Sequence, residues 1–233
     1  MEQNRLRIGG IPALLWGEAG DRIILAAHGS HASKTDDCIR ILAEEASERG
    51  FQVLSFDLPG HGERVHESGF LMPAECVREL MRMYEYAKEH ARSISLFGCS
   101  MGAYFQLLAF AHAEIERVWF LSPVTDMERI IHNLMEHCHL TEEAFREKVL
   151  VENEIEPLYY PYYEYVRSHP INAWPHRTHI LRGEGDTLCE YERVQQFCDR
   201  FGCELTEQKG GEHWFHTQPE LDYYRQWLRE RLR

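Results

Sequence analysis

The chain has 233 residues, of which 44% are hydrophobic and 27% are charged. This size and composition suit one folded α/β domain spanning residues 1–233, and they exclude a disordered chain, a collagen and a disulfide-stapled mini-protein. Lys and Arg number 25 against 38 Asp and Glu, so the formal net charge is −13. Because this charge repels phosphate backbones and anionic lipid, we expect no nucleic-acid partner and no membrane partner.

The cysteines form no Cys-x-x-Cys pair of the kind that binds zinc or carries out redox exchange. They stand singly, as Cys38, Cys76, Cys99, Cys138, Cys189, Cys198 and Cys203. Polar residues 17–21 follow the first short apolar run, so we expect neither a signal-peptide core nor a membrane span in this segment. We expect a reducing compartment and a cytoplasmic protein.

Strand-like and helix-like runs alternate through the first half of the chain. The expected strands cover residues 22–27, 52–57, 93–97 and 117–121, and the expected helices cover 36–50, 73–92 and 101–112. This alternation indicates a parallel sheet. The short runs 5–8 and 13–16 are expected to form a hairpin at one edge of that sheet.

The alternation stops between Thr125 and Trp174. This segment has no strand pattern, two helix-like stretches at 127–138 and 141–153, and a tyrosine-rich run at 159–165. Strands are expected again at 178–182 and 203–207, with helices at 191–201 and 219–232. We therefore interpret residues 125–174 as an insertion into one sheet that both halves of the chain share.

A candidate nucleophile lies in Gly98-Cys99-Ser100-Met101-Gly102, which fits the pattern G-x-S-x-G. In that pattern the serine occupies a strained turn between a strand and a helix, and small flanking residues allow the chain to bend. An apolar strand precedes the motif and an apolar helix follows it, as this turn requires. The alternative is a tight structural turn in which the serine is incidental.

A nucleophilic serine needs a histidine base and a carboxylate that orients the histidine. Asp186 follows the strand ending at Arg182, and His213 follows the next strand, so both are expected at the carboxyl edge of the sheet. Asp126 is the alternative acid, but Pro123 and three further residues carry it away from its strand. The alternative for His213 is a surface loop histidine.

An oxyanion on the substrate needs two preorganised N–H donors. We expect one from Met101, directly after the serine, and one from Ser30 in the loop after strand 22–27, with His31 as the alternative. Gly29 could instead be a simple turn glycine, and His28 a hydrogen-bonded core histidine.

Together these motifs resemble the alpha/beta-hydrolase superfamily, most closely its small cytosolic serine hydrolases related to serine aminopeptidases and monoacylglycerol lipases. The motifs that match are His28-Gly29, Asp57-Leu-Pro-Gly60-His61-Gly62, Gly98-x-Ser100-x-Gly102, Gly183-x-x-Asp186 and Gly210-x-x-His213. The resemblance implies an α/β-hydrolase fold, with a mostly parallel central sheet flanked by helices and a short, mainly helical cap at 125–174. Arg64 departs from the serine that relatives often carry there, at a position that is not catalytic in the family.

We expect the cap to shape the substrate pocket. The expected pocket residues are His28, Gly29, His31, Tyr159, Tyr160, Tyr162, Tyr163 and Trp214. The alternative for the tyrosines is the internal packing of the cap. Residues 125–174 contain ten acidic and four basic residues. We interpret this excess of acids as a solvated helix face. Alternatively, one of the carboxylates captures the amino group of a substrate.

The sequence therefore predicts a serine hydrolase, carboxylesterase-like or thioesterase-like, that cleaves a small-molecule ester through an acyl-enzyme on Ser100. No metal is expected, because the pairs His28/His31 and His213/His216 fall in loops rather than on one helix face. No cofactor is expected either, since the Pro-Gly-His-Gly loop carries no G-x-G-x-x-G pattern for a dinucleotide. An aminopeptidase or amidase of the same fold and a non-catalytic binding protein of that fold are the alternatives. The sequence leaves a homodimer open.

Overall fold

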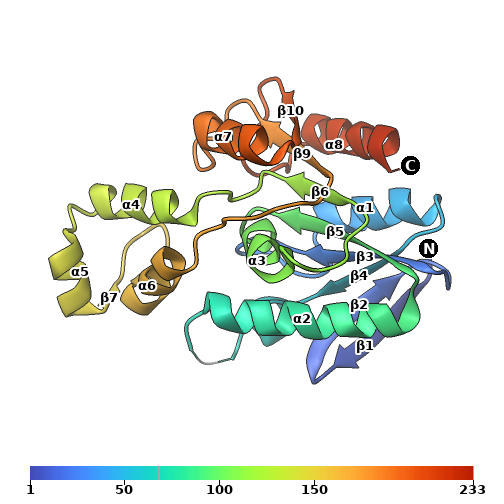
Figure 1. Cartoon of the computed structure of the whole chain (residues 1–233), viewed down its shortest axis with the longest axis horizontal. Helices are drawn as coiled ribbons and strands as arrows, with labels where there is room; N and C mark the ends of the chain where they lie inside the picture. Colours follow the sequence, from blue (N-terminus) through green and yellow to red (C-terminus); the bar gives the residue numbers. More distant parts are fainter. Residues whose placement is uncertain (68, 233) are drawn as a thin grey trace.

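The computed structural model describes residues 1–67 and 69–232, and its centre is an eight-stranded sheet (Figure 1). The strands, in spatial order, are β1 (Gln3–Ile8), β2 (Ile11–Trp16), β4 (Gln52–Phe56), β3 (Arg22–Ala27), β5 (Ser93–Cys99), β6 (Val118–Leu121), β9 (Thr178–Gly183) and β10 (Glu204–Gln208). Strands β1, β2 and β4 pair antiparallel, and every later neighbour pairs parallel. The predicted mostly parallel sheet and its edge hairpin are both confirmed.

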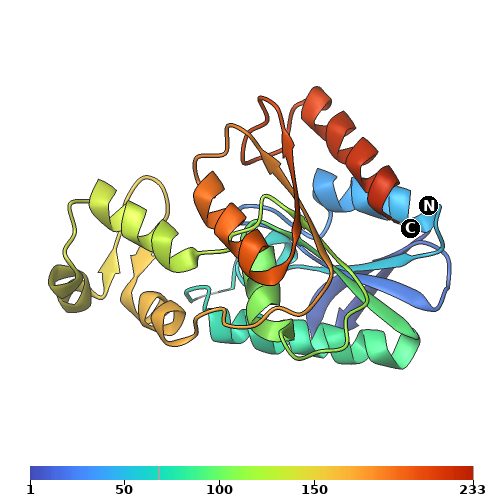
Figure 2. The same ribbon diagram turned by 45° about the horizontal axis from the view of Figure 1, so that its top comes forward.

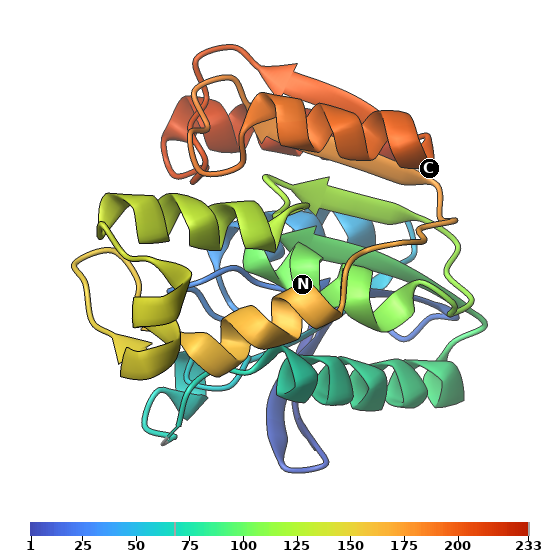
Figure 3. The ribbon, with the colours of Figure 1, turned by 60° about the vertical axis from the view of Figure 1, so that its left-hand side comes forward.

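Helices cover both faces of the sheet, as Figures 1 and 3 show. The helices α2 (Pro73–His90), α3 (Met101–Phe110) and α7 (Tyr191–Phe201) pack on one face, and α1 (Asp37–Ser47) and α8 (Gln218–Arg231) pack on the other. Central strands such as β3 are apolar along almost their whole length because both of their faces are covered. Among the described residues, no helix is both long and apolar enough to cross a lipid bilayer.

The segment between β6 and β9 lies beside the sheet, at the left of Figures 1 and 2. It contains α4 (Met127–His137), α5 (Glu142–Lys148), β7 (Leu150–Val151), β8 (Leu158–Tyr159) and α6 (Tyr160–Ser168). Rings of Phe145, Tyr160 and Tyr163 meet at centroid distances of 5.2–6.0 Å and form its own small core. We call residues 125–174 the insertion.

Two expectations for the insertion are wrong. The helix expected at 141–153 ends at Lys148, because Val149 takes a left-handed backbone conformation with φ 64°. Strands β7 and β8 then pair antiparallel where no strand was expected. The tyrosine-rich run is a helix from Tyr160 onward, with Pro161 in its first turn, where proline costs no hydrogen bond.

Candidate active site

Ser100 occupies a strained turn between β5 and α3. Its φ of 49° and ψ of −117° are uncommon for a residue with a side chain. The flanking glycines are required by close contacts: a Cβ at Gly98 would lie 2.6 Å from Ala103 Cα, and one at Gly102 would overlap the carbonyl oxygen of His28. The motif therefore forms the strand-turn-helix geometry that its spacing predicts, with Ser100 at the carboxyl edge of the sheet.

Backbone hydrogen bonds continue the sheet pairing beyond the ends of the strands. The Ser100 N–H donates to Leu121 O at 3.0 Å, and the Ser122 N–H donates to Leu181 O at 2.7 Å. Further along the same edge, the Glu184 N–H donates to Gln208 O at 2.9 Å, and the Gly185 N–H donates to Gly211 O at 2.8 Å. We call these four bonds the edge bonds, and they tie the loops of the candidate site to one another.

The structure brings Ser100, His213 and Asp186 into one hydrogen-bonded row. Ser100 Oγ lies 2.9 Å from His213 Nε2, and His213 Nδ1 lies 2.8 Å from Asp186 Oδ2. The Asp186 side chain is fully buried, whereas the His213 side chain is partly exposed. With its Nδ1–H donated to the carboxylate, the imidazole has a free Nε2 lone pair that can accept the serine proton.

Asp186 is held by its own loop and by a buried arginine. Its Oδ1 accepts the backbone N–H groups of Leu188 at 3.0 Å and Cys189 at 2.8 Å. Arg182, which is buried, donates to the carbonyls of Asp186 at 2.7 Å and Cys189 at 3.0 Å. Sequence reasoning missed Arg182, and the available signal was an arginine near the end of a strand that has to be covered on both faces.

The loop that carries His213 is held by Glu220 of α8, which sequence reasoning also missed. The Glu220 carboxylate accepts the N–H groups of Glu212 at 2.9 Å, Thr217 at 2.9 Å and His216 at 3.3 Å, and the Thr217 hydroxyl at 2.6 Å. Burial raises the pKa of Glu220, but these hydrogen bonds outweigh it and lower the pKa to about 2. The spacing Thr217-x-x-Glu220 is a capping box and could have revealed this residue.

The loop after β3 lies directly against Ser100. A Cβ at Gly29 would lie 3.2 Å from Ser100 Cβ, so only glycine allows this approach without displacement. Met101 is the first residue of α3 and follows the serine. The roles of Ser30 and Met101 as oxyanion donors stay predictions.

His28 is fully buried beneath this loop, which corrects its expected place in the lining of a pocket. Its Nε2 accepts the Leu58 N–H at 3.1 Å, so its Nδ1–H donates to Gly29 O at 2.7 Å. Burial lowers the pKa of His28 to about 4, and the ring is neutral at pH 7. It is the hydrogen-bonded core histidine that the alternative described.

The remaining expected pocket residues fall into separate environments. Tyr160 and Tyr163 belong to the core of the insertion, where their hydroxyls contact Arg146 and His132, which favours internal packing for this pair. The ring of Tyr159 stacks on Phe70, with 4.3 Å between centroids, and Tyr162 packs at the edge of the main apolar core. Two residues lie on the surface: His31 contacts Glu156 of the insertion at 3.1 Å, and Trp214, 70% exposed, stacks on His216.

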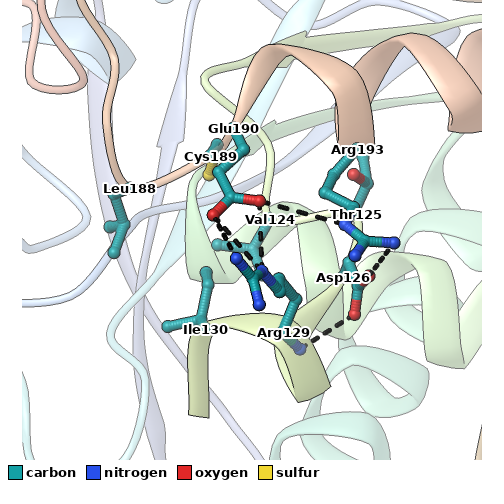
Figure 4. Close-up of a pocket in the computed structure, with 9 residues that line it drawn as sticks. All are labelled: Val124, Thr125, Asp126, Arg129, Ile130, Leu188, Cys189, Glu190 and Arg193. Atoms are coloured by element: carbon teal, nitrogen blue, oxygen red, sulfur yellow. Dashed lines mark hydrogen bonds and ion pairs between the residues drawn. The ribbon is translucent and has the colours of Figure 1, made fainter. Parts of the chain in front are cut away.

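The alternative acid, Asp126, is engaged elsewhere. Its Oδ1 accepts the Arg129 N–H at 3.0 Å as the N-cap of α4, and its Oδ2 lies 3.8 Å from Arg193 (Figure 4). In the same small pocket Arg129 forms a two-point ion pair with Glu190, at 3.0 and 3.1 Å. This cluster joins the base of the insertion to the start of α7, just beyond the Asp186 loop.

Sequence comparisons agree with the resemblance. The family model described as "Serine aminopeptidase, S33" matches residues 19–167. A carboxylesterase from Bacillus subtilis (strain 168) is 32% identical over 91 residues, which are 39% of this chain and 36% of the esterase. The match thus spans about a third of that relative's length.

Solved structures of similar fold cover nearly the whole chain. Est1E from Butyrivibrio proteoclasticus, with ferulic acid bound, gives a TM-score of 0.80 at 19% identity, covering 97% of this chain and 96% of that one. A putative hydrolase from Agrobacterium vitis S4 gives a TM-score of 0.79 at 19% identity, covering 100% and 99%. At such identities the likeness establishes the α/β fold and not the substrate.

Proposed function

Because the chain belongs to the alpha/beta-hydrolase family described as serine aminopeptidase S33, we propose that it hydrolyses small carboxylic esters or thioesters through an acyl-enzyme on Ser100. The observation that carries this proposal is the row of hydrogen bonds from Ser100 Oγ through His213 to the buried Asp186. The strained backbone of Ser100 adds support, since such strain collects at functional positions.

In the first step, Ser100 Oγ attacks the ester carbonyl carbon while His213 Nε2 takes the hydroxyl proton. The imidazolium is stabilised by Asp186, and it then donates the proton to the departing alcohol or thiol. A water molecule attacks the resulting acyl-serine in the same way, with His213 again as the base. The products are a carboxylic acid and a regenerated serine.

The negative oxygen of each tetrahedral intermediate would be held by the N–H groups of Met101 and Ser30. The contact between Gly29 and Ser100 supports this assignment, because it brings the loop after β3 to the side of the nucleophile. A side chain at position 29 would push that loop away.

The test of the reaction is covalent labelling with a fluorophosphonate, followed by turnover of a panel of p-nitrophenyl esters of increasing acyl length. We expect labelling of the wild type, none of Ser100→Ala, and turnover that falls with labelling. Cys99→Ser is a poor control because it lies inside the turn, so Ser33→Ala, in the loop before α1, is the matched control and should label normally. Labelling of Ser100→Ala, or no turnover by a labelled wild type, would contradict the proposal.

Aromatic acyl groups belong in the ester panel, because a protein of similar fold has been solved with ferulic acid bound. Hydroxycinnamate esters should therefore be compared with straight-chain esters of similar size. The insertion is the segment whose side chains would discriminate between such substrates.

A peptide substrate is the second candidate, and two observations favour it: the family description names aminopeptidases, and Glu156 presents a carboxylate beside the loop after β3. A carboxylate in that place could hold the amino group of a substrate. Short peptide arylamides separate the candidates. If they turn over faster than esters, and Glu156→Gln raises KM for arylamides alone, the aminopeptidase reading replaces the esterase reading.

A further inference from the structure

Cys189 lies beside the acid and the base, and the proposed hydrolysis does not use it. It is three residues beyond Asp186 in the same loop, and its own N–H holds Asp186 Oδ1 at 2.8 Å. As a result its thiol is buried next to the row of hydrogen bonds. Asp186, Cys189 and His213 each offer one atom that could bind a metal, and these three atoms lie within 4.8 Å of one another.

We propose that these three residues bind a thiophilic divalent metal ion, Zn²⁺ or Cd²⁺, and that the bound ion switches off hydrolysis. Thiolate sulfur, imidazole nitrogen and carboxylate oxygen are together a donor set that zinc prefers. At bond lengths of about 2.0–2.3 Å, tetrahedral coordination spaces such donors roughly 3.3–3.7 Å apart. The three donor atoms lie within 4.8 Å of one another, and His213 Nδ1 lies 2.8 Å from Asp186 Oδ2, so coordination needs shifts of about an ångström that open the latter contact, and water would take the fourth position.

The charges of the site favour a divalent ion. Burial and the neighbouring Asp186 carboxylate raise the pKa of Cys189, so the ion has to displace the thiol proton. Once bound, the ion neutralises two negative charges, one on Asp186 and one on the Cys189 sulfur, inside a buried site where unpaired charge is costly. The same loop that holds the acid also holds the sulfur, so little chain entropy is lost on binding. Arg182 contacts this loop only through backbone carbonyls, so the ion would compete for the Asp186 carboxylate with the N–H groups of the loop and with His213, and not with an arginine.

Loss of activity follows from where the protons go, and this part rests on the proposed function. The ion bonds to Cys189 Sγ and His213 Nδ1. The thiol proton passes to solvent, and the proton that the ion displaces from Nδ1 is carried on Nε2 instead. An imidazole with its proton on Nε2 has no lone pair facing Ser100, so it cannot accept the hydroxyl proton. One proton is released for each ion bound, and no electron transfer occurs.

Binding is tested first, without reference to activity. Chelator-treated full-length protein is titrated with Cd²⁺, and the ultraviolet band of cadmium–thiolate charge transfer is recorded. We expect one equivalent of this band in the wild type, none in Cys189→Ala, and an unchanged band in Cys138→Ser, the matched control in the insertion. Equal bands in the wild type and Cys189→Ala would overturn the proposed site.

Inhibition is tested second, with Zn²⁺ added to the ester assay at constant ionic strength and each variant compared with its own metal-free rate. The zinc concentration for half inhibition should rise at least about tenfold in Cys189→Ala and stay the same in Cys138→Ser. EDTA should restore the wild-type rate. An unchanged half-inhibition concentration in Cys189→Ala would overturn the inhibitory role.

A second variant covers the case in which Cys189→Ala does not fold. His213→Ala changes a partly exposed side chain and removes the nitrogen ligand, so it should weaken the cadmium band at least about tenfold. Retention of the band at full affinity would overturn the site. If the protein hydrolyses no ester at all, the proposed function fails, but the cadmium titration still decides whether the metal site exists.

Discussion

The Glu220 carboxylate accepts the backbone N–H of Glu212 at 2.9 Å, and Glu212 directly precedes His213. The capping box of α8 therefore also holds the loop that carries the candidate base. Glu220 does not touch Ser100 or His213. Its effect on the reaction must pass through the position of the imidazole.

Glu220→Gln should lower kcat about tenfold with little change in KM, because an amide cannot accept all four of the N–H and O–H groups that the carboxylate accepts. The measurement is ester turnover at pH 7 over a range of substrate concentrations, which gives kcat and KM separately. Asp222→Asn, an exposed change on the same helix, is the control and should leave kcat as it is. A larger effect on KM than on kcat would show that Glu220 acts on binding instead.

Glu220 also predicts a pH dependence of stability. Its pKa is about 2 in the folded protein against an ordinary value of 4.5. The contribution of Glu220 to the free energy of unfolding is therefore fully present above about pH 4.5 and is lost as the pH falls toward 2. The Tm of the wild type should therefore fall more steeply between pH 5 and pH 3 than the Tm of Glu220→Gln. Parallel Tm curves for the two proteins would be the opposite result.

Replacing each candidate acid by the corresponding amide distinguishes Asp186 from Asp126 as the residue that orients His213. Asp186→Asn should lower kcat on the order of a thousandfold, because His213 loses the carboxylate that fixes its tautomer and stabilises its charged form. Asp126→Asn should stay within about tenfold of the wild type, since Asp126 caps α4 and pairs with Arg193. The ester assay reports both, and the reverse order would move the acid to Asp126.

Gly102, two residues after Ser100, gives a test of the turn. Gly102→Ala would drive a methyl group into the carbonyl oxygens of Ala27 and His28, and it should destabilise the protein by about 1–3 kcal/mol and reduce fluorophosphonate labelling. Gly20→Ala, where the nearest atom is 3.4 Å from the added carbon, should do neither. Urea unfolding measures the first effect. An unchanged Gly102→Ala protein would mean that the turn is less tight than described.

The insertion is tested through its small core. Phe145→Ala removes a fully buried ring from between Tyr160 and Tyr163, at a cost of about 3–5 kcal/mol to the packing there. We expect limited proteolysis to cut within residues 127–168 sooner and ester preference to change, while Ser100 still labels. Phe145→Leu is the milder control. Complete loss of labelling in a folded Phe145→Ala protein would make the insertion part of the catalytic machinery.

The sheet and the row Ser100–His213–Asp186 could be predicted because each depends on local patterns. Each of these residues follows a strand in the parallel part of the sheet, and the carboxyl ends of parallel strands meet at one edge. Their convergence follows from strand direction alone, so it requires no knowledge of side-chain packing.

The parts that could not be predicted depend on contacts between distant residues. His28 is held by the N–H of Leu58, which lies 30 positions away, and α5 ends at a valine in a conformation that valine rarely adopts. The helix from Tyr160 to Ser168 has little helix-forming composition and owes its form to its contacts with Phe145 and α4.

The edge bonds have a consequence for the motions of the protein. Amide protons of Ser100, Ser122, Glu184 and Gly185 are engaged in bonds that open only when neighbouring strands separate. In deuterated water they should exchange about as slowly as those of the central strands, whereas the short pairing of β7 with β8 should exchange early. The candidate catalytic residues would then lie at an edge of the sheet that opens slowly, and the local motions that admit a substrate would occur in the insertion.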